Sequence, residues 1–205
     1  MLTIIDYNTG NLGSIKNMLK RLGIASEITN DKQKIENAEK LILPGVGHFD
    51  YGMQQLHKSE LIPLLNKKVL QDKTPILGIC LGVQLLTESS EEGTEKGLGW
   101  IKGKTIAFDK TKLANNQKIP NMGWTDVANY QQSKLFENMH EEPRFYFVHS
   151  FHLELENKND CLVTAKYGYD FAAGIEHENI LGTQFHPEKS HKYGMKLLEN
   201  FHKNY

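Results

Sequence analysis

Short apolar segments alternate with amphipathic stretches over the first 98 residues. The apolar runs predicted as buried strands are 2–7, 25–28, 40–43 and 75–79. Leu12, Ile15 and Leu19 recur at helical spacing before Gly23, a residue that commonly ends helices. Helices are predicted at 11–22, 61–70 and 81–88. Because strands that alternate with helices build parallel sheets covered on both faces, this half predicts an α/β fold with right-handed crossovers.

The pattern changes after about residue 98, where strand-like segments follow one another with little helical sequence between them. The predicted strands are 104–108, 144–148, 151–155, 162–167, 172–176 and 180–185. A closing helix is predicted at 193–201. The C-terminal half therefore adds antiparallel strands to an open, mixed and mainly parallel sheet. With no repeat, low-complexity tract or linker, residues 1–205 are interpreted as a single domain.

Charge and composition narrow the function classes. The chain has 24 basic and 25 acidic residues, which argues against nucleic-acid binding because that function favours a basic excess. No apolar run approaches the roughly 18 residues of a membrane span, and residues 1–6 lack the features of a signal peptide. We expect a cytoplasmic chain whose two cysteines stay reduced. No histidine pair has zinc-ligand spacing, so no metal site is expected.

Cys80 lies where a buried strand runs directly into a helix. Gly78 and Gly82 flank it in the pattern Gly-x-Cys-x-Gly, the form of a nucleophile elbow with cysteine in place of serine. The following helix N-terminus would favour a thiolate, and the N–H of Leu81 would lie near a developing oxyanion. The alternative is a buried core cysteine. Cys161 has no such flanking pattern and is interpreted as inert.

His186 is the candidate base for this nucleophile. It leaves the carboxyl end of the predicted strand 180–185, so it should reach the same edge of the sheet as Cys80. Glu188, two residues further, could accept the other ring N–H and fix the tautomer. The alternative is a surface turn in which the two side chains have no such role.

These segments together resemble the class I glutamine amidotransferases. Within that class the motifs resemble the glutaminase subunit of imidazole glycerol phosphate synthase, and they extend over essentially the whole chain. The matching segments are 6–12, 43–47, 78–84, 118–124, 147–150 and 184–190. The sequence departs from the usual family pattern at His48, Asn8, Asn121 and Phe151. The resemblance implies a flavodoxin-like amidotransferase fold.

The resemblance also implies glutamine hydrolysis to glutamate and ammonia without a cofactor. Cys80 would form the thioester, His186 would move the proton and Glu188 would orient His186. Oxyanion contacts would come from the backbone at Val46, Gly47 and Leu81, with the loop 44–47 acting as a switch. Glutamine-binding residues would be Gly47, Gly82, Gln84, Glu88, His149, Ser150 and Phe151.

Ammonia must stay unprotonated to react, so a chain that releases it needs a partner that captures it. By resemblance the partner is a cyclase subunit, a (β/α)₈ barrel, which forms a heterodimer with this chain in histidine biosynthesis. The motif positions that would contact it are Asn11, Met122, Trp124 and Tyr146. For Trp124 the alternative is a core tryptophan.

Three other functions stay open at this point. A paralogous amidotransferase could supply ammonia for amidino sugars of surface polysaccharides. A non-catalytic binding module could use the same fold, although the presence of Cys80, His186 and Glu188 argues against it. Other cysteine hydrolases could share the elbow but give no reason for Gln84 or for the segment 120–124. We expect low glutaminase activity in the unpartnered chain.

Overall fold

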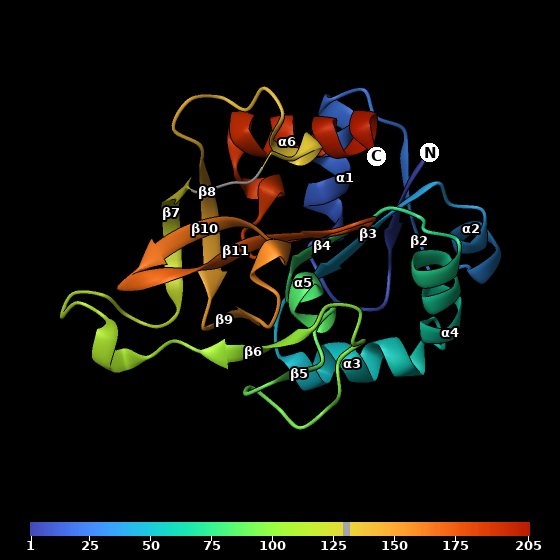
Figure 1. The fold of residues 1–205 in the computed structure, drawn as a ribbon. Helices are drawn as coiled ribbons and strands as arrows, with labels where there is room; N and C mark the ends of the chain where they lie inside the picture. Colours follow the sequence, from blue (N-terminus) through green and yellow to red (C-terminus); the bar gives the residue numbers. More distant parts are fainter. Residues whose placement is uncertain (129–131) are drawn as a thin grey trace.

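The computed structural model describes residues 1–128 and 132–205 (Figure 1). One mixed sheet runs through these residues and contains twelve strands. The strands are β1 Leu2–Ile5, β2 Ser26–Thr29, β3 Lys40–Gly45, β4 Ile76–Cys80, β5 Ser89–Ser90, β6 Gly103–Ala107, β7 Asn121–Ala128, β8 Arg144–His149, β9 Phe151–Leu155, β10 Cys161–Tyr167, β11 Tyr169–His177 and β12 Ile180–Thr183.

The sheet has a parallel half and an antiparallel half. Its main path runs β2-β1-β3-β4-β12-β11-β10-β7-β8, and β5, β6 and β9 join it from the side. All neighbours from β2 to β12 are parallel, whereas β12, β11, β10, β7 and β8 pair in antiparallel fashion. The predicted α/β class, with antiparallel strands in the C-terminal half, is confirmed.

Helices cover both faces of the parallel half (Figure 1). The helices are α1 Leu12–Arg21, α2 Lys32–Glu36, α3 Phe49–Lys58, α4 Ile62–Asn66, a π-helical turn Lys67–Gln71, α5 Leu81–Leu85 and α6 His191–Asn204. Short 3₁₀ turns lie at Lys110–Lys112, Lys134–Phe136, Lys158–Asp160 and Pro187–Lys189. The apolar faces of α1 and α6 form one core with the sheet, and those of α2 to α5 form a second core on the other face.

The central strands are apolar throughout because both of their faces are covered. Every residue of β1, β4 and β12 is buried, which is the pattern that identified them in the sequence. Parallel strands end at the same edge of a sheet, so this arrangement brings the carboxyl ends of β3, β4 and β12 together. The loops that follow these strands contain the candidate site residues.

Four helices and strands were not predicted, and one helix is shorter than expected. The sequence pattern missed α2, α3, β5 and β7. The predicted helix 81–88 ends at Leu85, because Thr87 closes the turn by donating its N–H and its hydroxyl to the carbonyl of Gln84. Glu88 then donates its N–H to the carbonyl of Gly103. The chain has therefore left the helix before Glu88.

Candidate active site

Cys80 lies in a strained turn between β4 and α5. Its backbone has φ 54° and ψ −112°, a left-handed conformation that is rare for any residue with a side chain. The two flanking glycines make the turn feasible. A Cβ on Gly78 would lie 2.8 Å from the Cα of Val83, and one on Gly82 would lie 1.9 Å from the carbonyl oxygen of Leu43. This is the geometry of a nucleophile elbow.

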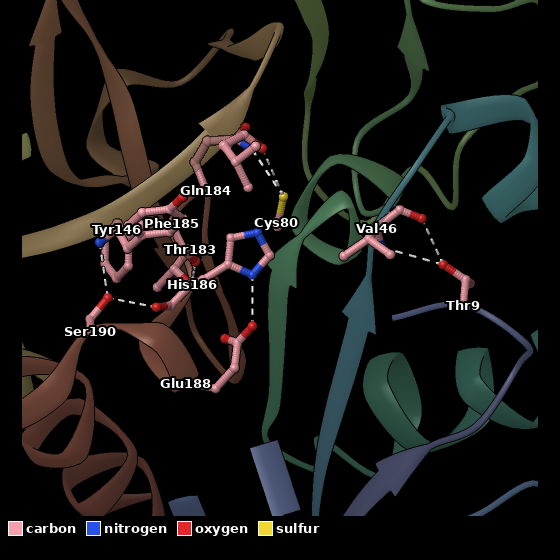
Figure 2. A network of polar contacts seen from close by, with 11 residues as sticks. Thr9, Val46, Cys80, Tyr146, Thr183, Gln184, Phe185, His186, Glu188 and Ser190 are labelled. Carbon is pink, nitrogen blue, oxygen red and sulfur yellow. Dashed lines mark hydrogen bonds and ion pairs between the residues drawn. The ribbon is translucent and has the colours of Figure 1, made fainter. Parts of the chain in front are cut away.

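His186 and Glu188 form a buried pair directly after β12. The imidazole Nδ1 lies 2.7 Å from Glu188 Oε1, and both side chains are 1% exposed. Figure 2 shows the ring between the Cys80 sulfur and the Glu188 carboxylate. The other ring nitrogen, Nε2, is buried and forms no hydrogen bond with the residues that the structure describes. That nitrogen therefore remains available for proton exchange at the sulfur.

Backbone hydrogen bonds fix the position of this histidine. The N–H of His186 donates to the carbonyl of Tyr146 on β8, and the Ser190 hydroxyl donates to the carbonyl of His186 at 2.6 Å. The same hydroxyl accepts from the N–H of Tyr146 (Figure 2). The loop after β12 is thus attached to the neighbouring strand on both sides of the ring.

The electrostatic surroundings of His186 favour its charged form. Burial disfavours the imidazolium and lowers the pKa. The Cys80 sulfur and the Glu188 carboxylate outweigh burial and raise the pKa of His186 to about 9. A protonated imidazole beside a cysteine stabilises the thiolate, because the two charges are opposite. His186 therefore favours the charged imidazolium beside the Cys80 sulfur.

A cavity of about 330 Å³ opens at Cys80 and His186. It has the size of a small-molecule site. Nine of its lining residues are predicted site residues, and Glu92, Pro120 and Val148 are additional. The lining residues are Val46, Gly47, Cys80, Leu81, Gln84, Glu92, Pro120, Val148, His149, Ser150, Phe151 and His186.

Gln84 is oriented by two internal acceptors. Its Nε2 donates to the carbonyl of Phe151 at 3.2 Å and to Oε1 of Gln184 at 3.0 Å. Because both amide hydrogens are used, the group that Gln84 can offer to a ligand is its carbonyl oxygen. Gln84 therefore presents an acceptor to the cavity.

His149 supports the same wall as a neutral ring. Its Nδ1 lies 2.7 Å from the carbonyl of Phe151, and its Nε2 lies 3.2 Å from the side-chain nitrogen of Asn121. Burial lowers the pKa of His149 to about 3. The pair of contacts assigns the proton to Nδ1, since Nε2 must accept from the Asn121 amide. Asn121, a departure from the family pattern, thus has a defined role.

Two predicted substrate contacts lie elsewhere. Glu88 lies outside the cavity lining, because α5 ends before it and its carboxylate contacts Lys102 and the N–H of Gly103. Gly82 lies outside the cavity lining, packed against the backbone of Leu43. The absence of a side chain at Gly82 allows the close backbone approach that the nucleophile elbow requires.

Glu92 is a cavity residue that the sequence analysis missed. One carboxylate oxygen accepts the N–H of Phe49, the first residue of α3, at 2.8 Å. No spacing in the sequence distinguishes Glu92 from Glu88 or Glu91, because its place depends on how the segment after β5 folds back onto α3. Glu92 therefore places a carboxylate in this wall of the cavity.

The loop 44–47 lies across the cavity from His186. Val46 is 41% exposed, and its backbone is held by Thr9. The Thr9 hydroxyl accepts from the N–H of Val46 at 3.3 Å and donates to the carbonyl of Val46 at 3.0 Å (Figure 2). Gly47 has φ 102°, which suits a hinge. In this conformation the N–H of Val46 is engaged by Thr9.

Three of the four predicted interface residues are exposed, and the fourth, Tyr146, is partly exposed. Met122 and Trp124 of β7 are 62% and 44% exposed, so the alternative of a core tryptophan is wrong. The Trp124 ring stacks on His191 at 5.5 Å and meets the edge of Tyr146. Asn11, just before α1, is also exposed. Tyr146 connects this face to the site, because its carbonyl accepts from His186.

Among residues 1–128 and 132–205, His, Cys, Asp and Glu side chains nowhere gather in a group of three that could hold a metal ion. None of the helices in this described part has the length and apolarity that crossing a bilayer requires.

The fold and the site define an amidotransferase, and comparison with known proteins agrees. Residues 3–204 match the family described as glutamine amidotransferase class-I, and the chain belongs to this family. Solved structures share the fold at low identity. They include a glutamine amidotransferase (TM-score 0.71, 18% identity, 98% of each chain) and PurLQS from Thermotoga maritima (TM-score 0.73, 19% identity, 98% of this chain and 96% of that chain).

Closer relatives narrow the class. The chain is 56% identical to imidazole glycerol phosphate synthase subunit HisH 2 of Methanococcus maripaludis and 45% identical to the protein of the same name in Pseudomonas aeruginosa, each over 98% of both chains. Subunit HisH of Sulfurimonas denitrificans is 46% identical over 99% of this chain and 98% of that protein. The resemblance drawn from the motifs is confirmed.

Proposed function

We propose that this chain is the glutaminase subunit of imidazole glycerol phosphate synthase and supplies ammonia for histidine biosynthesis. The observation that carries the proposal is the Cys80 sulfur facing a buried His186–Glu188 pair at the mouth of a 330 Å³ cavity. Relatives named subunit HisH, at 42% to 56% identity over nearly the full length, support the same activity.

The hydrolysis proceeds in two proton-balanced steps. The Cys80 thiolate attacks the side-chain carbonyl of glutamine, and His186 gives its proton to the departing ammonia, which leaves a thioester. Neutral His186 then removes a proton from water as the water attacks the thioester, and glutamate is released with the thiolate restored. Glu188 holds the ring by the hydrogen bond to Nδ1 and stabilises the imidazolium in each resting state.

The oxyanion of each tetrahedral intermediate needs donors near Cys80. The N–H of Leu81 follows the nucleophile directly, and the loop at Val46 and Gly47 supplies the second donor. Because Thr9 engages the N–H of Val46, the described conformation is a resting state. Rotation of the peptides around Val46 and Gly47 completes the oxyanion hole.

Substrate recognition follows from the charges of the cavity. The ammonium of glutamine pairs with the Glu92 carboxylate, and the carbonyl of Gln84 accepts a further N–H. The backbone at Gly47, His149, Ser150 and Phe151 forms the remaining wall that binds the substrate. Neutral His149 adds no charge there and holds the carbonyl of Phe151 in place.

The partner is a cyclase with a (β/α)₈ barrel, which forms a heterodimer with this chain. The exposed aromatic and apolar side chains of β7, next to the strand that holds His186, support a docking face here. The names of the relatives, which call them subunits, support an assembly. The single sheet supports one domain over residues 1–205. Both cysteines are unpaired, which supports a reducing compartment such as the cytoplasm.

A second pathway could use the ammonia that this chain releases. The relatives of Methanococcus maripaludis and Pseudomonas aeruginosa both carry the number 2 in their names, which is consistent with more than one such subunit in an organism. Amidino-sugar synthesis is the second candidate pathway, and in this proposal the acceptor binds to the partner and not to this chain. The chemistry at Cys80 is the same in both.

The experiment measures glutamate release from glutamine by the purified chain, with and without the cyclase encoded beside it. We expect release that depends on the partner and disappears in Cys80→Ala. The product formed by the complex from the ribulosyl-formimino carboxamide nucleotide then distinguishes histidine biosynthesis from the sugar pathway. Absence of release from the folded complex would contradict the proposal and favour a binding module.

A further inference from the structure

The side chain of Gln184 lies between the nucleophile and Gln84. Gln184 is completely buried, and the proposed hydrolysis does not use it. Its Nε2 lies 3.9 Å from the Cys80 sulfur, and its Oε1 accepts from Gln84 Nε2 at 3.0 Å (Figure 2 shows the contact with the sulfur). In a buried network of this kind the direction of each hydrogen bond decides which group the carboxamide can donate to.

Strand register places this side chain. β12 and β4 are parallel neighbours, and Thr183 pairs with Ile79 at their carboxyl ends. Gln184 and Cys80 are the residues that follow this pair on the two strands, so they lie side by side at the edge of the sheet. The N–H of Gln184 donates to the carbonyl of Ala173 at 2.8 Å, which holds its backbone on the β11 side. The position of Gln184 is therefore as rigid as the sheet.

The orientation of the carboxamide follows from its neighbours. Gln84 Nε2 donates to the carbonyl of Phe151, and an amide oxygen at that position could not donate. The nitrogen and oxygen of the Gln84 carboxamide therefore cannot be interchanged. Gln184 must accept from that nitrogen, which assigns its oxygen to Gln84 and its nitrogen to Cys80. The bonds run in one direction, from Gln84 through Gln184 to the sulfur.

We propose that Gln184 donates its side-chain N–H to the Cys80 thiolate and so belongs to the catalytic machinery. The proposal rests on the nucleophilic role given to Cys80 above. His186 stabilises the same thiolate but gives up its proton during the reaction. Gln184 supplies a donor that does not titrate, so the sulfur keeps a partner when it leaves the thioester. Gln84 polarises this donor by binding its oxygen.

The test measures the pH dependence of Cys80 alkylation by iodoacetamide, which needs neither glutamine nor the partner. A Cys161→Ser background removes the second thiol, whose sulfur contacts only the carbonyl of Val163 among the contacts of the described residues. Gln184→Met keeps the length of the side chain and removes the donor. We expect the alkylation midpoint to rise by about one pH unit, which is about tenfold slower alkylation at a pH below the midpoint.

Thr183→Val is the matched control. It removes one buried hydrogen bond, from the Thr183 hydroxyl to the carbonyl of Phe185, one residue from Gln184 and away from the sulfur. We expect its alkylation profile to match that of the parent. An equal shift in Thr183→Val and Gln184→Met would overturn the proposal, because it would assign the effect to local packing.

A second variant decides the matter if Gln184→Met does not fold. Gln84→Met removes the group that orients Gln184, so the midpoint should rise by a smaller amount. Profiles of the folded variants that superpose on the parent would overturn the proposal. The readout is independent of the proposed function: retained glutamate release in Cys80→Ala would contradict that function, whereas the alkylation profiles judge only Gln184.

Discussion

The hydroxyl of Thr9 bridges the backbone of Val46, 3.0 Å from its carbonyl oxygen and 3.3 Å from its amide nitrogen. The two residues are 37 positions apart and meet because β1 and β3 are parallel neighbours whose carboxyl ends lie together. The N–H that this contact occupies is one of the donors proposed for the oxyanion hole. We therefore expect Thr9 to stabilise the described conformation of the loop 44–47.

Removal of this hydroxyl should activate the unpartnered chain. Thr9→Val keeps the shape of the side chain but loses both contacts with Val46. One hydrogen bond contributes on the order of 1 kcal/mol, so we expect about fivefold faster glutamate release without the cyclase. Thr9→Ser retains the hydroxyl and should behave like the parent. Equal activity of Thr9→Val and the parent, both folded, would show that Thr9 does not restrain the loop.

Glu92 should affect glutamine affinity more than turnover. Glu92→Gln keeps an oxygen that can accept from the N–H of Phe49 and removes the negative charge of the cavity wall. Loss of the charge that pairs with the substrate ammonium should raise KM about tenfold or more in the complex, with a smaller change in kcat. Steady-state glutaminase kinetics measure both. Glu88→Gln is the matched control and should leave KM unchanged, because Glu88 lies outside the cavity.

His186 should make stability depend on pH. Its pKa is raised from 6.5 to about 9 in the folded chain, so its contribution is complete below about pH 6.5 and is lost as pH rises through 9. The free energy of unfolding should therefore fall by roughly 3 kcal/mol over this window. Urea denaturation at pH 6, 7.5 and 9 measures it. Glu188→Gln removes the carboxylate that stabilises the imidazolium, so its free energy of unfolding should change less with pH than that of the parent. An equal pH dependence in the two proteins would contradict the assignment to His186.

Trp124 should contribute to partner binding and not to the fold. Its ring is 44% exposed beside Tyr146 and His191. Trp124→Ala should raise the Kd for the cyclase about 30-fold, as for an aromatic residue at the centre of an interface, with little change in thermal stability. Calorimetry on the purified subunits measures the affinity. Tyr51→Ala, which removes another exposed aromatic ring on α3, should bind like the parent.

Local sequence was enough for the elbow and the histidine turn. Gly78 and Gly82 are required because the backbone passes within van der Waals contact of itself, and that requirement is visible in five consecutive residues. The pair of His186 and Glu188 is separated by only two positions, so its hydrogen bond is also local. The buried strands were visible for a similar reason, since an uninterrupted apolar run follows from burial on both faces.

Shorter and less regular elements were harder to predict. β7 lies near the edge of the sheet and alternates exposed and buried residues around Met122 and Trp124, so no apolar run marks it. The end of α5 depends on the side chain of Thr87, which competes for the helical carbonyl of Gln84. The position of Glu88 outside the cavity follows from that early end of the helix.

The sequence by itself predicted the elbow at Cys80, the turn of His186 and Glu188 and the class of fold, because each leaves a pattern in consecutive residues. Only the tertiary structure placed Thr9, Glu92 and Gln184 at the site. Their partners are distant in the chain and are brought into contact by the register of parallel strands and by the return of the segment after β5 onto α3. No local pattern encodes such contacts, because they depend on the packing of the whole sheet.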